Sequence, residues 1–159
     1  MGKILKSYSN GWAGAIARSL DDVVVALPNR SDAALAFGVP VALSSDKSGV
    51  IPFDANTHTA ADFVGVTVRN PSKTPEAYGS NAGSYAAKDL VDVLVRGHIS
   101  VVFDNYDAKA GEGAGVSKST GNFTSGSGDT LVALPTVSVS GAPDNSGVAE
   151  LLLKTRNLL

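Results

Sequence analysis

The alternation of apolar and polar residues is the feature that most constrains the fold of this chain. The stretch "FVGVTVR" (63–69) has a valine at every second position, and "DLVDVLVRG" (89–97) repeats the pattern. A period of two is that of a β-strand with one buried face. We expect the valines of the first stretch to face the core and Gly65, Thr67 and Arg69 to face outwards. No stretch shows a convincing helical spacing, so we predict an all-β fold.

Further stretches with β-branched residues or the same alternation fill much of the remaining chain. They are 20–27, 35–43, 98–103, 115–120, 130–139 and 148–154. We expect 35–43 to form one strand with a single apolar row, and Gly97 to make a turn between two strands. Pro40 cannot donate a ladder hydrogen bond, which indicates a sheet edge or a bulge. Many short strands separated by Gly, Pro and Asn are typical of a β-barrel or β-sandwich.

The chain of 159 residues has the length of one domain. We predict a single jelly-roll-like β-barrel or β-sandwich domain with long loops at 20–159, preceded by an N-terminal arm at 1–19. The arm has little pattern but carries Tyr8 and Trp12. It is either a first strand packed on its own barrel or an extension that docks on a neighbouring molecule, since interfaces are enriched in Tyr and Trp.

The composition excludes several classes of function. The chain has no cysteine, so neither disulfides nor thiolate metal sites are available. A formal net charge of -2 lacks the basic footprint of a nucleic-acid-binding protein. No apolar run approaches the ~20 residues of a membrane span. We expect a soluble protein that is made in a cytoplasm and binds neither nucleic acid nor membrane.

No motif predicts catalysis, a cofactor or a metal. The stretch "GEGAGVSKST" (111–120) resembles a phosphate loop, but two residues separate Gly115 from Lys118 where a P-loop needs Gly-Lys. The stretch "DNYDAKAGEG" (104–113) carries carboxylates without the ligand spacing of a calcium loop. The two histidines, His58 and His98, lie far apart in the sequence. We predict a protein that is not an enzyme and has no cofactor.

The loop "NPSKTPEAYGSNAGSYAAKD" (70–89) is twenty residues long and rich in Gly, Ser, Pro and Asn. Loops of this length without secondary structure are uncommon in compact domains and are usually functional or disordered. This one carries Tyr78 and Tyr85. The two tyrosines either anchor another protein or cap the end of their own barrel.

Several blocks of the sequence, taken together and in order, resemble the structural cement, or head decoration, proteins of tailed bacteriophages. The blocks are "AFGVPV", "AADFVGVTVR", "KTPEAYGSNAGSYAAKDLVDVLVRGHISV", "SKSTGNF" and "NSGVAELLLKTRNL". They extend over roughly 36–158, which is most of the chain. The parts "YGS", "VDVLVRG" and "GVAE" are the most specific.

The resemblance implies a β-rich virion protein on the outer surface of an icosahedral capsid, synthesised in the cytoplasm of a bacterial host. Its partners would be the major capsid protein, whose subunits it bridges, and further copies of itself in a homodimer or homotrimer. We expect the N-terminal arm and the loop at 70–88 to make these contacts, with Lys73 meeting an acidic patch of the shell. The residues expected at capsid-docking or self-association contacts are Tyr8, Trp12, Lys73, Tyr78 and Tyr85.

Three other functions stay open on the sequence. A lectin-like carbohydrate-binding module on the virion would use exposed aromatic residues, for which Trp12, Tyr78 and Tyr106 are candidates. A tail or baseplate β domain would have the same fold at another place on the particle. An enzyme would use His98 with a nearby carboxylate.

Overall fold

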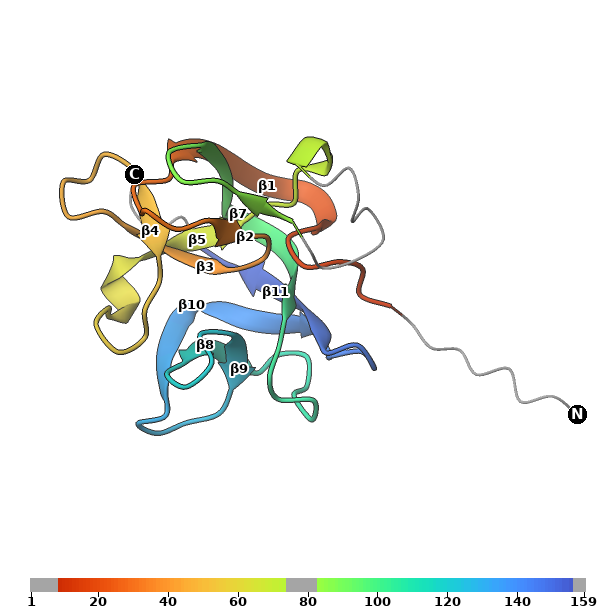
Figure 1. Cartoon of the computed structure of the whole chain (residues 1–159). Helices are drawn as coiled ribbons and strands as arrows, with labels where there is room; N and C mark the ends of the chain where they lie inside the picture. The colour runs from red at the N-terminus through yellow and green to blue at the C-terminus, as the bar shows by residue number, and fades with distance from the viewer. Residues whose placement is uncertain (1–8, 74–82, 156–159) are drawn as a thin grey trace, which may run out of the picture.

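The computed structural model describes residues 9–73 and 83–155 of the chain, and in these residues it is a β protein (Figure 1). The all-β prediction is confirmed. The strands are β1 (Ile16–Pro28), β2 (Leu35–Ala36), β3 (Pro40–Leu43), β4 (Val50–Pro52), β5 (Phe63–Thr67), β6 (Ser84–Tyr85), β7 (Leu90–Val102), β8 (Gly113–Ser117), β9 (Phe123–Ser125), β10 (Leu131–Gly141) and β11 (Val148–Leu153). Two short 3-10 helices, η1 (Ala60–Asp62) and η2 (Pro71–Lys73), interrupt them. No helix in the described ranges is long and apolar enough to cross a membrane.

Nine strands form one antiparallel sheet that curls into the shape of a barrel. Its order is β4-β3-β5-β7-β11-β10-β8-β9, with β1 also paired to β7, while β2 and β6 form a separate small ribbon. An isolated bridge connects each of the two end strands, β4 and β9, to another part of the sheet. Asn29, just after β1, pairs with Val50 of β4, and Phe103, just after β7, pairs with Phe123 of β9. The predicted boundary between arm and domain, between residues 19 and 20, falls inside β1.

The central strand of the sheet is β7, which pairs with β1, β5 and β11. The prediction of a turn at Gly97 is wrong, because β7 continues through this residue. Gly97 has a φ of 122°, a value that glycine tolerates and other residues rarely adopt. The pairing register of β1 shifts opposite this point, where Arg18 pairs with His98 and Val23 with Arg96. The sheet therefore bends at Gly97 without a break.

Buried apolar side chains form two cores on opposite faces of the central strands. The members of the small core are Leu35, Phe37, Val41, Val50, Val64, Tyr85, Val91, Val93 and Val95. The large core includes Phe53, Phe63, Val66, Leu94, Ile99, Val101, Phe103, Phe123, Leu134, Leu151 and Leu153. The strand β7 contributes to both cores, since Val91, Val93 and Val95 belong to the small core and Leu94, Ile99 and Val101 to the large one.

Two predicted strand patterns differ from the structure for reasons of packing. The stretch 35–43 is not one strand, because it breaks at Gly38, whose φ is 71°. The five side chains of the predicted apolar row nevertheless all pack in or against the small core: Leu35, Phe37, Val39, Val41 and Leu43. The three valines of 63–69 do not share a face, because Val64 lies in the small core whereas Val66 lies in the large core. The whole of β5 is buried, including Thr67, which we expected to face outwards. Because the two cores cover both faces of β5, none of its residues faces solvent.

The turn between β3 and β4 is held by the carboxylate of Asp46. This carboxylate accepts hydrogen bonds from the hydroxyls of Ser44 and Ser48, each at 2.6 Å, and from the backbone N–H of Ser48 at 3.1 Å. These donors, the Ser44 hydroxyl first, hold the pKa of Asp46 well below its usual value of 3.8. Because the folded state binds this proton more weakly than the unfolded state, the contribution to stability is present above the unfolded pKa and is lost as the pH falls.

We predict that the thermal unfolding temperature is nearly constant between about pH 7 and pH 5 and falls below about pH 4, as paired carboxylates become protonated. Exposed Asp54 and Asp62 and half-buried Asp89 have lowered pKa values as well and act in the same direction. Scanning calorimetry from pH 7 to pH 3 measures this. The Asp46→Asn variant should be less stable at pH 7 and lose less stability on acidification. An equal loss in both proteins would contradict the role of Asp46.

Candidate functional site

Residues 9–15, which we call the strap, lie alongside β7 directly before β1 and are fixed first by Asn10. The backbone N–H of Asn10 donates to the Asp144 carboxylate at 2.8 Å. Its side-chain amide donates to the carbonyls of Ala142 and Val148, both at 2.7 Å, and its carbonyl accepts a hydrogen bond from the Ser100 hydroxyl. One asparagine thus connects the strap to the β10–β11 connection and to β7.

A second set of contacts fixes the other end of the strap. Gly14 donates to the Ser100 carbonyl at 2.7 Å, and the Ser100 N–H donates to the Ala15 carbonyl at 2.9 Å. Gly14 also lies directly against Gly38, with φ values of 81° and 71°. A β-carbon on Gly14 would come within 2.9 Å of the Gly38 nitrogen, and one on Gly38 within 2.6 Å of the Gly14 nitrogen. This close approach requires glycine on both sides.

The strap presents Trp12 to solvent, as expected for a residue that contacts another protein. Its side chain is 43% exposed, while the next residue, Ala13, is buried. The Trp12 carbonyl accepts a hydrogen bond from the N–H of Ala15 at 2.9 Å, which closes a tight turn. Because both ends of the strap are hydrogen-bonded to the sheet, the indole is carried by backbone that is already ordered.

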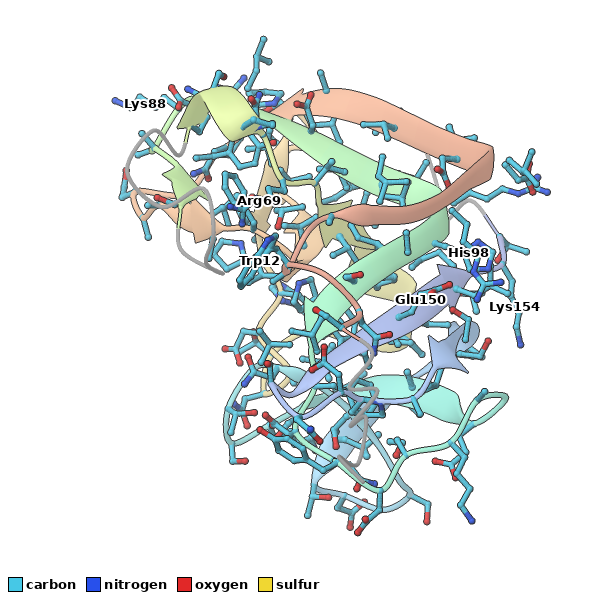
Figure 2. All side chains as sticks on the ribbon, turned by 90° about the vertical axis from the view of Figure 1, so that its right-hand side faces the viewer. Trp12, Arg69, Lys88, His98, Glu150 and Lys154 are labelled. Carbon is cyan, nitrogen blue, oxygen red and sulfur yellow. The ribbon has the colours of Figure 1, made fainter. Side chains whose placement is uncertain are left out.

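Arg69 belongs to a segment that is hydrogen-bonded to the strap, and Figure 2 labels it together with Trp12. Its backbone N–H donates to the carbonyl of Gly14 at 2.7 Å, which ties it to the strap two residues from Trp12. Its guanidinium carbon lies 5.8 Å from the centre of the Phe37 ring, within the range of a cation–π contact. An exposed indole on the strap, together with an oriented guanidinium on the segment bonded to the strap, is suited to bind a protein surface that offers both apolar and acidic groups.

Tyr85 lies in the small core and is completely buried, so its predicted role as a docking anchor needs correction. Its ring contacts Phe37 edge to face, with 5.4 Å between ring centres, and its hydroxyl donates to the Val68 carbonyl at 2.6 Å. Burial and the nearby Asp92 carboxylate raise the pKa of Tyr85 well above its usual value of 10. A side chain without exposed surface cannot contact a partner, and the alternative of a tyrosine that closes its own domain describes Tyr85.

Lys73 stands at the base of the loop at 70–89 and already has a partner within the chain. Its ammonium lies 2.6 Å from the Asp89 carboxylate, with both side chains about one-third exposed. Lys73, together with the N–H of Ala86, lowers the pKa of Asp89. The ion pair connects the two ends of the loop. The remaining predicted contact residues, Tyr8 and Tyr78, lie outside the described residues.

No sequence pattern indicated a role for Asn10 or Arg69, which fix and flank the strap. The pair Asn10-Gly11 indicates a turn, but the partners of Asn10 lie 90 to 138 positions away, where sequence patterns do not reach. Arg69 appeared as the outward end of an alternating strand, whereas β5 ends two residues earlier. The contact of Gly14 with Gly38 had no sequence signal beyond the two glycines.

The structure gives little support to the catalytic alternative at His98. Glu150, the nearby carboxylate, lies 2.7 Å from Arg18 and accepts a hydrogen bond from the Ser140 hydroxyl at 3.0 Å (Figure 2). In the described ranges, no hydrogen bond joins the His98 ring to a carboxylate, and no group of three or more potential metal ligands occurs. The carboxylate of Asp104, in the acidic stretch 104–113, accepts hydrogen bonds from the side chains of Thr120 and Asn122.

Comparisons with known proteins show the family of the chain and its fold. No curated protein matches the chain. A chain of a solved structure described as "The capsid of Myoviridae Phage XM1" matches with a TM-score of 0.72 and 16% sequence identity, over 96% of each chain. At this identity the likeness shows the fold. The family model described as "Structural cement protein (E217 gp24/Pam3 gp6)" matches residues 4–154. The chain therefore belongs to the phage family of structural cement proteins and has a structural, capsid-associated role in the virion.

Proposed function

We propose that this protein binds the outer surface of a phage capsid, bridges neighbouring subunits of the major capsid protein and performs no catalysis. The observation that carries the proposal is the match of the cement-protein model to residues 4–154. Cementing requires a stable domain with an ordered contact surface and no reacting group. The double core and the anchored strap provide these two properties.

Bridging stabilises a shell through the surface that subunit separation would expose. A specific protein interface buries ~1,200–2,000 Å² in total. A protein that contacts two subunits at once gains a second contact at high effective concentration, which raises the overall affinity by ~10²–10⁴ over that of one contact. Because it binds the assembled shell and not the separated subunits, the equilibrium shifts towards the shell by mass action.

The strap with Trp12 and Arg69 is the surface that we assign to the capsid contact. Energetically dominant interface residues are enriched in Trp and Arg. The hydrogen bonds of Asn10 and Gly14 order the strap before binding, so less conformational entropy is lost on contact. Lys73 contributes less than expected from the sequence, since Asp89 already balances its charge.

The direct test is co-sedimentation of the purified protein with undecorated phage heads. We expect saturable binding at a fixed number of copies per head and a higher temperature of thermal disruption for decorated heads. Separated major capsid protein should bind more weakly, because one copy of the cement protein then contacts one subunit. Failure to bind heads, or binding that leaves their thermal disruption unchanged, would refute the cementing function.

The contact surface is tested with Trp12→Ala in the same assay. We expect the apparent affinity for heads to fall by at least about tenfold, the effect of losing ~1.4 kcal/mol at a buried aromatic contact. Tyr106→Ala is the matched control, since Tyr106 is also an exposed aromatic residue but lies in the connection after β7, outside the strap. Equal affinities of the wild-type protein and Trp12→Ala would exclude the strap as the contact.

A further inference from the structure

One edge of β1 is open within the part of the chain that the structure describes. In an antiparallel sheet, successive residues of a strand form hydrogen bonds to opposite sides. The Asp92 carbonyl accepts a hydrogen bond from the Val68 N–H. In this part of β7, the backbone N–H and C=O groups of even-numbered residues therefore point towards β5. The backbone groups of odd-numbered residues consequently point towards β1, where Val93 pairs with Val25. The backbone groups of Val24 and Ala26 consequently point away from the sheet.

The side chains on this edge leave it accessible to another strand. Val24 is 41% exposed, and Ala26 is exposed as well. The sequence from 23 to 29 contains no charged residue, although charged side chains are the usual protection of edge strands. The register shift after Arg18 and the missing N–H of Pro28 limit the edge at its two ends. What is open is one short apolar stretch.

We propose that this edge pairs with the same edge of a second copy of the chain, antiparallel and about a two-fold axis. Val24 of one copy then lies opposite Ala26 of the other, and the four residues exchange backbone hydrogen bonds across the axis. The two sheets join into one. The inference rests on the proposed cementing function for its biological meaning, since a dimer offers two capsid-binding surfaces to the shell.

Charge favours a second copy in this orientation. Asp21 and Asp22 precede the open stretch, and Arg30 follows it. Asp21 is paired with Arg96 at 2.5 Å, so the net negative charge at this end is that of Asp22. Antiparallel pairing brings the acidic end of one copy to the basic end of the other, whereas parallel pairing would bring like charges together. The same surface meets itself in such a dimer, which is the usual symmetry of closed homodimers.

Flanking apolar side chains extend the contact beyond the backbone. Leu20 is fully exposed at the shifted part of β1. Leu90, which pairs with Pro28, is 65% exposed at the other end of the stretch. A stable interface buries more surface than one short strand pair supplies. These two leucines provide the additional area.

The oligomeric state of the free protein tests the proposal without phage heads. Sedimentation equilibrium should give twice the chain mass of 16.1 kDa. Val24→Lys places two like charges at the axis and should weaken the dimer by at least about tenfold. Ala26→Pro removes an outward N–H and should act in the same direction. Tyr106→Lys, the same kind of change at a distant exposed site, should leave the dimer intact.

Engineered cysteines test the register, because the natural chain contains none. A mixture of Val24→Cys and Ala26→Cys proteins should form a disulfide-linked dimer faster than either variant alone, since these two positions face each other across the axis. Tyr106→Cys controls for random collision. Equal rates for the mixture and the control would overturn the proposed pairing.

The outcomes separate this inference from the cementing function. A monomeric wild-type protein, or a dimer that Val24→Lys leaves unchanged, overturns the β1 pairing whether or not the protein binds heads. A monomer whose binding to heads is abolished by Val24→Lys also overturns it, and shows that the edge receives a strand of the capsid protein. A dimer lost in Val24→Lys supports the pairing even where head binding fails.

Discussion

The substitution Tyr85→Ala is expected to lower the free energy of unfolding by about 3–5 kcal/mol, the usual cost of removing a large aromatic side chain from a core. Tyr85 is among the largest fully buried side chains, and its ring contacts Phe37. Its removal leaves a cavity in the small core and an unpaired Val68 carbonyl. Urea unfolding followed by tryptophan fluorescence measures the effect, since Trp12 is the only tryptophan.

Two controls show whether the effect comes from burial. Tyr85→Phe keeps the ring and removes only the hydroxyl, so it should cost about 1–3 kcal/mol for the unsatisfied carbonyl. Tyr106→Ala changes an exposed tyrosine and should stay within about 0.5 kcal/mol of the wild-type protein. A Tyr85→Ala protein of wild-type stability that binds heads poorly would instead restore Tyr85 as a contact residue.

The substitution Gly65→Ala is expected to destabilise the protein by about 3 kcal/mol, at the upper end of the usual cost of overpacking. A β-carbon at this position would lie 2.2 Å from the Leu94 carbonyl oxygen and 2.9 Å from a Val93 methyl. The carbonyl belongs to the backbone of β7 and cannot turn aside. Relief requires β5 and β7 to separate, and both faces of β5 are packed. Calorimetry should show a lower unfolding temperature.

Gly113→Ala is the matched control for this prediction. Gly113 also lies in a strand, at the start of β8, but a β-carbon there would meet no atom within 4 Å. Replacing glycine with alanine at such a position is neutral or slightly stabilising, because the unfolded chain loses freedom. Similar losses in both variants would mean that the cost is a property of strand glycines in general and not of the contact with Leu94.

The alternation in the sequence predicted the strands well where one face is buried, as in β11. It failed where the environment changes within a strand. In β7 the same odd-numbered pattern continues on both sides of Gly97, although the side chains enter different cores. In β5 both faces are buried, so Thr67 could not be distinguished from a surface residue. Burial on two faces is set by tertiary packing, which a local pattern does not contain.

In the candidate site, too, the burial of a side chain depends on tertiary packing that a local sequence pattern does not contain. The exposure of Trp12 could be predicted, because an indole in a polar, weakly patterned segment has no obvious core to enter. Tyr85 had a similar local sequence but pairs through β6 with β2, and this small ribbon leads it into the core. The distinction depends on pairing between segments about fifty residues apart. Asn10 was missed for the same reason, since its function lies in its distant partners.

The continuity of β7 through both cores has a mechanical consequence. A domain with two cores in separate sheets could yield at the junction, one half opening while the other stays folded. Here the junction is a single covalent strand whose edges are hydrogen-bonded to β1, β5 and β11. A force applied along this strand loads many hydrogen bonds in shear at the same time. The domain should therefore unfold as one unit under load, a property that suits the proposed cementing of a capsid.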